Sequence, residues 1–203
     1  MALQIFIARH GQNQDNANGI LNGHRDLPLT TIGLQQAQDL AVGINEVGLQ
    51  FDHVYCSPLL RAHQTAQIVC ERNQLPDPTI LPELIERDFG IMTGKPQASI
   101  TELCAPDIIQ ADVVTYFLNP EGAETFPDLI KRAERVLEII ESKHADGNIL
   151  LVGHGDFGKM IYAAATKTPW EDVLVNFHFG NGDLIEVSPS GESHVIRLPQ
   201  HNS

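Results

Sequence analysis

The segment 148–155, NILLVGHG, contains four large apolar residues in succession and ends in a Gly-His-Gly triplet. A half-exposed strand alternates apolar and polar residues, whereas a central strand of a parallel sheet is covered on both faces and forms a continuous apolar run. This segment therefore predicts a buried parallel strand with helices on both sides of its sheet. The segment 3–8, LQIFIA, predicts a second strand, which ends in Arg9-His10-Gly11.

Helical patterns alternate with strands along the rest of the chain. Further strands are expected at 53–57 and 79–81 and, as edge strands, near 176–180, 183–187 and 194–198, and helices at 30–48, 58–73, 120–144 and 156–166. The segment 11–30 is interpreted as a loop, and 97–118 as one or two weak helices. The alternation is typical of an α/β fold, so we expect a three-layer, doubly wound, mostly parallel sheet with helices on both faces and a small helical cap.

No repeat, charge run or low-complexity linker interrupts the chain. We therefore expect residues 1–203 to form a single domain, with the cap as an insertion at about 91–122.

The charge of the chain restricts its partners. Thirteen Lys and Arg stand against 26 Asp and Glu, a formal net charge of −13, whereas nucleic-acid and anionic-membrane binders depend on basic surface. We expect neither partner, and instead a small-molecule or protein partner. A site for an anionic substrate would have to gather its few arginines locally. The sequence leaves the oligomeric state open, a homodimer included.

Three cysteines, Cys56, Cys70 and Cys104, are odd in number and widely spaced. This favours three buried thiols in a reducing compartment over a disulfide framework. No segment has the roughly 18 apolar residues of a membrane span, and the N-terminus lacks a secretory apolar region, so we expect a cytoplasmic protein. No clustered Cys and His spacing indicates a metal site.

The chemistry is expected where the two predicted strands end. His10 and His154 each lie beside a glycine at the carboxyl edge, where open α/β sheets bind their ligands. A neutral imidazole can attack phosphorus and form a phosphohistidine, and forked guanidinium groups match the charge on the equatorial oxygens. Arg9 and Arg61 are the candidates for that task.

The leaving oxygen needs a proton, and a carboxyl group in a partly closed loop can supply it when burial raises its pKa. Glu83 and Glu86 are both placed for this role. Lys95 and Arg87 have either a substrate-binding or a surface role. The remaining histidines are interpreted as structural or surface residues: His24, His53, His63, His144, His178, His194 and His201.

Five blocks in order resemble the histidine phosphatase superfamily, which includes the cofactor-dependent phosphoglycerate mutases. They are Arg9-His10-Gly11, Asn16, the run from Ser57-Pro58 through Arg61-Ala62 to Thr65-Ala66, the run Glu86-Arg87-Asp88-Phe89-Gly90, and Gly153-His154-Gly155. Together the blocks extend over nearly the whole chain.

The resemblance implies a role for each matched residue. His10 would be the phosphorylated nucleophile, Arg9, Arg61 and His154 the phosphate pocket, Glu86 rather than Glu83 the proton donor, and Asn16, Asn22, Gly23 and Gly155 the substrate-binding positions. The resemblance implies no metal and no nucleotide cofactor.

Departures from the family concern the substrate. Asp15 stands where mutases carry Trp, His24-Arg25 replaces an aromatic pair, and the cap segment 97–120 has no arginine to hold a second anionic group. We therefore expect a phosphatase that acts on small phosphorylated metabolites. The alternatives are a phosphoglycerate mutase-type phosphotransferase and a non-catalytic phosphate- or phosphoprotein-binding module.

Overall fold

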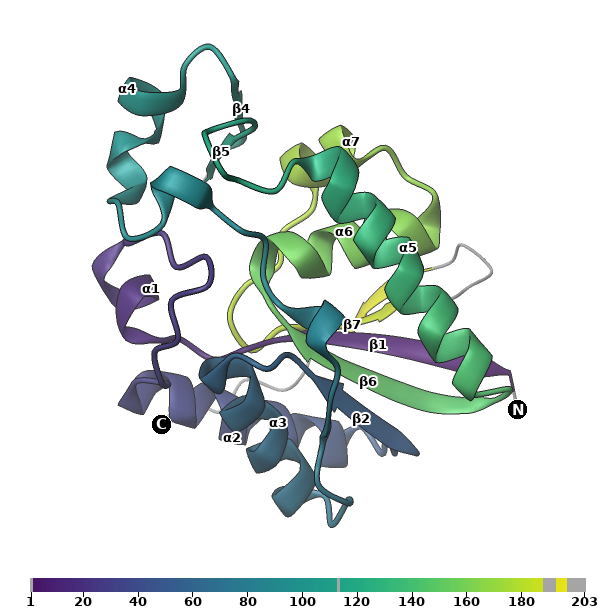
Figure 1. The fold of residues 1–203 in the computed structure, drawn as a ribbon. Coiled ribbons are helices and arrows are strands. Elements are labelled where there is room, and N and C mark those ends of the chain that lie inside the picture. The colour runs from purple at the N-terminus through teal and green to yellow at the C-terminus, as the bar shows by residue number, and fades with distance from the viewer. Residues whose placement is uncertain (1, 113, 188–192, 197–203) are drawn as a thin grey trace.

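The computed structural model describes residues 2–112, 114–187 and 193–196 and has a six-stranded central sheet (Figure 1). The strand order is β3 (Thr79–Ile80), β2 (His53–Cys56), β6 (Gly147–Gly153), β1 (Leu3–Arg9), β7 (Leu184–Val187) and β8 (Ser193–Ile196). The first four strands are parallel to their neighbours, and β7 and β8 pair antiparallel at one edge. The predicted mostly parallel α/β sheet is confirmed.

Helices cover both faces of the sheet (Figure 1). One face packs on α2 (Thr31–Glu46) and α3 (Leu60–Arg72), and the other on α5 (Phe126–Lys143), α6 (Gly155–Thr166) and α7 (Trp170–Asn176). Alternate residues of one strand enter the two resulting cores, since Ile149 and Leu151 contact the second helical layer whereas Leu150 and Val152 contact the first. Strand β6 is therefore covered on both faces, as its apolar run predicts.

Local sequence signals place the helix ends. The side chain of Thr30 accepts a hydrogen bond from Gly33 N at the start of α2, and Thr125 accepts one from Asp128 N at the start of α5. Gly11 and Gly33 then permit a close approach, because a Cβ on Gly11 would lie 2.2 Å from Gly33 O. The chain that leaves β1 can thus pack directly on α2.

The cap, residues 91–122, stands beside the carboxyl edge of the sheet, over the short helix α1 (Gln14–Asn18) (Figure 1). Its helical part is a 3-10 turn, Gln97–Ser99, that continues into α4 (Ile100–Cys104). The rest is an antiparallel hairpin of β4 (Ile108–Gln110) and β5 (Thr115–Phe117), where only helices were predicted. Short β-branched and aromatic runs fit a strand as well as a helix, so periodicity could not separate the two. Two further 3-10 turns, Pro82–Leu84 and Gly90–Met92, lead into the cap.

Other predicted features need correction. The edge strand near 176–180 is wrong, because α7 extends to Asn176 and the chain then turns irregularly to β7. The loop 11–30 contains α1, which an Asn13 capping box starts. Cys104 is partly exposed on the cap, whereas Cys56 and Cys70 are buried as expected. Of the strand expected at 194–198, residues 197 and 198 lie outside the described chain.

No helix in the described ranges is long and apolar enough to cross a bilayer.

Candidate active site

The two sheet-edge histidines meet because their strands are neighbours. Strands β1 and β6 pair in parallel with Arg9 opposite Gly153, and the next residue of each strand is a histidine. The backbone N–H of His10 donates to Gly153 O at 3.0 Å, and the two imidazole rings lie 5.1 Å apart between centroids. The register of the sheet thus brings His10 and His154 together.

The hydrogen bonds of His10 determine its tautomer. Nδ1 lies 2.6 Å from Gly11 O, which can only accept, so Nδ1 carries the proton. Nε2 then holds a lone pair and accepts from Arg61 Nε at 3.2 Å. Burial, with Arg61 and Arg9 nearby, lowers the pKa of His10 well below its ordinary value of 6.5. The ring is therefore neutral, with the lone pair on Nε2.

The position of His154 is fixed by a serine hydroxyl. Its Nε2 lies 2.7 Å from Ser57 Oγ, which already accepts a hydrogen bond from Leu59 N. When the serine donates its proton to His154 Nε2, the ring proton lies on Nδ1. Burial and the neighbouring cations lower the pKa of His154 as well. Ser57 begins the matched run that extends from Ser57-Pro58 to Thr65-Ala66. Its contact with His154 could not be inferred from the sequence.

Two arginines flank the histidine pair. Arg9 donates from Nη1 to Phe179 O at 2.7 Å. Arg61 is fully buried and donates from its two terminal nitrogens to Arg25 O and Gly23 O, and burial lowers its pKa to about 10, which keeps it charged at neutral pH.

Two polar atoms at this point have no hydrogen-bond partner within the described residues: Nε of Arg9 and Nδ1 of His154. Buried donors are almost always satisfied in folded proteins. Two orphaned donors beside a neutral nucleophile are what an anionic ligand such as a phosphoryl group would satisfy.

Glu86 is held beside the N-terminus of α6. Its Oε1 accepts from Arg87 N at 2.9 Å and from Phe157 N at 3.1 Å, which leaves Oε2 to carry a proton. Burial is the main cause that raises the pKa of Glu86 above its ordinary 4.5, and the carboxylate of Asp156 raises it further. Glu83 is only half-buried and is not among the pocket-lining residues. The geometry therefore favours Glu86 over Glu83 as the proton donor.

Arg132 of α5 fixes the loop that carries Glu86. It donates to the carbonyl oxygens of Glu83, Ile85 and Glu86 and pairs with Glu124 at 2.6 Å. Nothing in the sequence pattern identifies this residue, because a helix-face arginine is usually solvated.

A pocket of about 380 Å³ has Arg9, His10 and Glu86 in its lining, whereas Arg61 and His154 are fully buried and are not in the lining. Of the residues predicted to bind substrate, Asn16, Asn22 and Gly155 are also in its lining. A Cβ on Gly155 would lie 3.3 Å from Cζ of Arg9, so glycine lets that guanidinium pack against the start of α6.

Asn22 and Gly23 hold other residues of the site in place. The side chain of Asn22 exchanges two hydrogen bonds with that of Asn13, at 3.1 and 3.2 Å. Gly23 is not in the described lining, and its carbonyl oxygen instead holds Arg61. His24, expected to be structural, lies 2.8 Å from Glu86 O.

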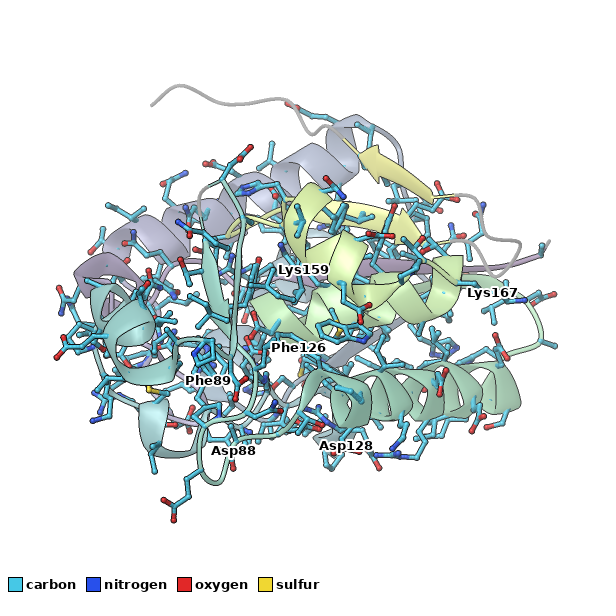
Figure 2. The ribbon with its side chains drawn as sticks, turned by 90° about the horizontal axis from the view of Figure 1, so that it is seen from above. Asp88, Phe89, Phe126, Asp128, Lys159 and Lys167 are labelled. Carbon is cyan, nitrogen blue, oxygen red and sulfur yellow. The ribbon has the colours of Figure 1, made fainter. Side chains whose placement is uncertain are left out.

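Two ionisable residues in the pocket lining, Lys159 and Asp156, were not predicted from sequence. Lys159 of α6 is buried and donates to Tyr116 Oη and to Phe177 O, and burial lowers its pKa to about 8 (Figure 2). Asp156, on the turn before it, pairs with Arg87 at 3.6 Å. Arg87 is fully buried rather than at the surface, while Lys95 is half-buried and outside the lining. Asp156 and Lys159 follow His154 closely in the sequence, so both lie near the start of α6. This spacing is the one sequence signal that could have predicted them as pocket residues.

No three His, Cys, Asp or Glu side chains in the described ranges come together as a metal site would require.

Comparison with known proteins gives concordant matches. A family model described as the histidine phosphatase superfamily (branch 1) matches residues 5–201. The adenosylcobalamin/alpha-ribazole phosphatase of Escherichia coli (strain K12) is 32% identical over 177 residues, covering 83% of this chain and 82% of that protein. A 2,3-bisphosphoglycerate-dependent phosphoglycerate mutase of Rhizobium etli is 28% identical over 174 residues, covering 84% and 83%. The crystal structure of the alpha-ribazole phosphatase from Shigella flexneri is 27% identical, with a TM-score of 0.77 over 97% of this chain and 96% of that chain.

Proposed function

The chain belongs to the histidine phosphatase superfamily, and from this premise we propose that it hydrolyses small phosphomonoesters through a phosphohistidine on Nε2 of His10. The observation that carries the proposal is the state of His10. A proton on Nδ1 fixed by Gly11 O, a lone pair on Nε2 and a lowered pKa together make a neutral nucleophile.

In the first step, Nε2 attacks phosphorus while the bond from phosphorus to the ester oxygen breaks. The ester oxygen takes a proton from Oε2 of Glu86 and leaves as an alcohol. The raised pKa of Glu86 keeps that proton available toward neutral pH. The phosphoryl group is now bonded to His10.

In the second step, the ionised Glu86 removes a proton from a water molecule that attacks the phosphoryl group. The bond from nitrogen to phosphorus breaks, inorganic phosphate forms, and His10 and protonated Glu86 are regenerated. Glu86 thus acts first as an acid and then as a base on the same face of the phosphoryl group.

Electrostatic stabilisation comes from Arg9, Arg61 and His154. The unpartnered Nε–H of Arg9 and Nδ1–H of His154 are suited to the equatorial oxygens, where negative charge spreads in the transition state. Arg61, which donates to Nε2 of the free nucleophile, would transfer that hydrogen bond to a phosphoryl oxygen as attack begins.

Hydrolysis is favoured over mutase chemistry by the cap. A mutase must hold a second anionic group of its substrate, and residues 97–120 contain neither Arg nor Lys. The named relatives include both a phosphatase and a mutase, so activity that depends on a bisphosphoglycerate primer would identify the alternative. We also propose that the reaction needs no metal and that the enzyme acts in the cytoplasm, in keeping with its free cysteines.

The test is release of inorganic phosphate from a panel of small phosphomonoesters with a chelator present, for the natural chain and His10→Ala. Release that persists with chelator and is lost in the variant supports the proposal. Full activity of the variant contradicts the mechanism. Phosphate binding without release from any ester would instead favour a binding module.

A further inference from the structure

The pocket wall that faces the leaving group carries a signal about substrate class. Six of the apolar side chains in the lining come from four segments of the chain: Ile20, Leu21, Phe89, Ile100, Val114 and Phe117. Four of them, Leu21, Phe89, Ile100 and Phe117, are buried together in one cluster with Met92. Phe89 and Phe117 meet edge to face, with ring centroids 5.2 Å apart. This wall is preformed and mostly apolar, as pockets for uncharged organic groups are.

The first cation near this wall, Arg87, is already fully engaged. Its guanidinium donates to the carbonyl oxygens of Glu124, Phe117 and Leu118, at 2.7 to 2.9 Å. It also lies over the rings of Phe117 and Phe126, at 4.6 and 4.1 Å from their centroids, and pairs with Asp156. Its role is to hold the cap to α5 and α6.

The second cation, Lys159, is held in a similar way by Tyr116 Oη at 2.7 Å and Phe177 O at 2.5 Å. In Figure 2, Lys159 lies on α6 while Phe89 lies beside the cap. The remaining basic residue of the described wall, His178, is exposed, where an ion pair contributes little. A second anionic group on a substrate would thus compete with these acceptors for Arg87 and Lys159.

Negative charge on the pocket wall also disfavours a second anionic group on the substrate. The carboxylate of Asp156 lines the pocket together with Glu86, and its ion-pair partner, Arg87, also donates to three carbonyl oxygens. A substrate carboxylate or second phosphate placed here would lose its hydration and face a like charge, and both effects weaken binding.

We infer that the enzyme selects phosphomonoesters whose leaving group is uncharged and has an apolar or aromatic face, and discriminates against esters that carry a second anionic group. The inference rests on the proposed phosphatase function and assigns the substrate class of the same site. The phosphoryl group occupies the histidines and arginines, while the organic part lies against Phe89, Phe117 and the cap.

Two esters that differ by one carboxylate test the inference: phenyl phosphate and 4-carboxyphenyl phosphate. The carboxylate makes the phenolate a slightly better leaving group, so slower turnover of that ester reports the pocket and not the intrinsic chemistry. We expect kcat/KM for phenyl phosphate to be at least about tenfold higher.

Val114→Arg adds a cation to the wall at a half-exposed position and should raise kcat/KM for the carboxylated ester about tenfold. Leu103→Arg places the same charge on the cap outside the pocket lining and should leave both esters unchanged.

The outcomes separate the two proposals. Equal rates for the two esters, or faster turnover of the carboxylated one, overturn the inference and leave the phosphatase function intact. An equal gain from Val114→Arg and Leu103→Arg would show that overall charge, and not the wall, sets the preference, which also overturns it. No release from either ester, or from nitrophenyl phosphate, refutes the proposed function itself.

Discussion

The group of Arg9, His10, Arg61 and His154, here called the floor, is held by regular backbone, and its Arg9 and His10 line the pocket. The β4–β5 hairpin of the cap is instead held to the rest of the molecule by side chains. The two histidines take their places from the register of β1 and β6, because each lies one residue beyond a paired position. The cap hairpin is instead attached by Arg87, which donates to the carbonyl oxygens of two of its residues. A floor defined by sheet register can stay constant while a hairpin held by side chains changes, so chemistry and specificity are separable in this fold.

Loss of the nucleophile should have the largest effect on the floor. We expect His10→Ala to lower kcat by on the order of 10⁴-fold or more, because no other described group offers a neutral nitrogen beside the two orphaned donors. His53→Ala is the matched control, since His53 is exposed at the start of β2. Rates are measured as phosphate release. A loss below about tenfold in His10→Ala would mean that the floor does not supply the nucleophile.

The proton donor links the floor to the loop that leads into the cap. Glu86→Gln should lower kcat about 10²- to 10⁴-fold for an alkyl phosphate, whose alkoxide needs a proton, but much less for nitrophenyl phosphate. Glu83→Gln should change neither rate, because Glu83 does not line the pocket. Equal losses on the two esters in Glu86→Gln would assign the acid to another group.

Sequence predicted the floor far better than the cap, for a physical reason. The run before His154 is typical of a central strand, which places the histidine beside a glycine at the carboxyl edge of the sheet. The β4–β5 hairpin gave no such signal, because three-residue strands are too short to show alternation. Lys159 and Arg132 were missed because a buried cation depends on partners far away in the chain, such as Tyr116 and Glu83.

Lys159 spans the two regions and should have a smaller effect. Lys159→Met breaks the link between Tyr116 of the cap and Phe177 and leaves both polar groups unsatisfied. We expect a loss of about 1–3 kcal/mol in the free energy of unfolding. We also expect a KM rise of roughly tenfold with little change in kcat, since the cap and not the floor is displaced.

Lys131→Met is the matched control, because its ion pair with Asp128 is exposed and worth little. Urea unfolding and steady-state kinetics of both variants provide the measurement. A fall in kcat with constant KM in Lys159→Met would mean that Lys159 acts on the floor.

Asp156 affects the chemistry through the charge of its carboxylate, which raises the pKa of the proton donor Glu86. Burial raises the pKa of Glu86 and Asp156 raises it further, so the alkaline limb of the kcat profile should lie above pH 4.5, where the proton donor ionises. Burial and the nearby arginines lower the pKa of His10 well below 6.5, which favours its neutral form along this limb. Asp156→Asn removes a like charge, lowers the pKa of Glu86 and should move the alkaline limb to lower pH, while Asp128→Asn, distant on α5, should not move it. A limb that stays in place in Asp156→Asn but disappears in Glu86→Gln would mean that burial alone sets the acid, and a limb that moves to higher pH would contradict the assigned sign of the interaction.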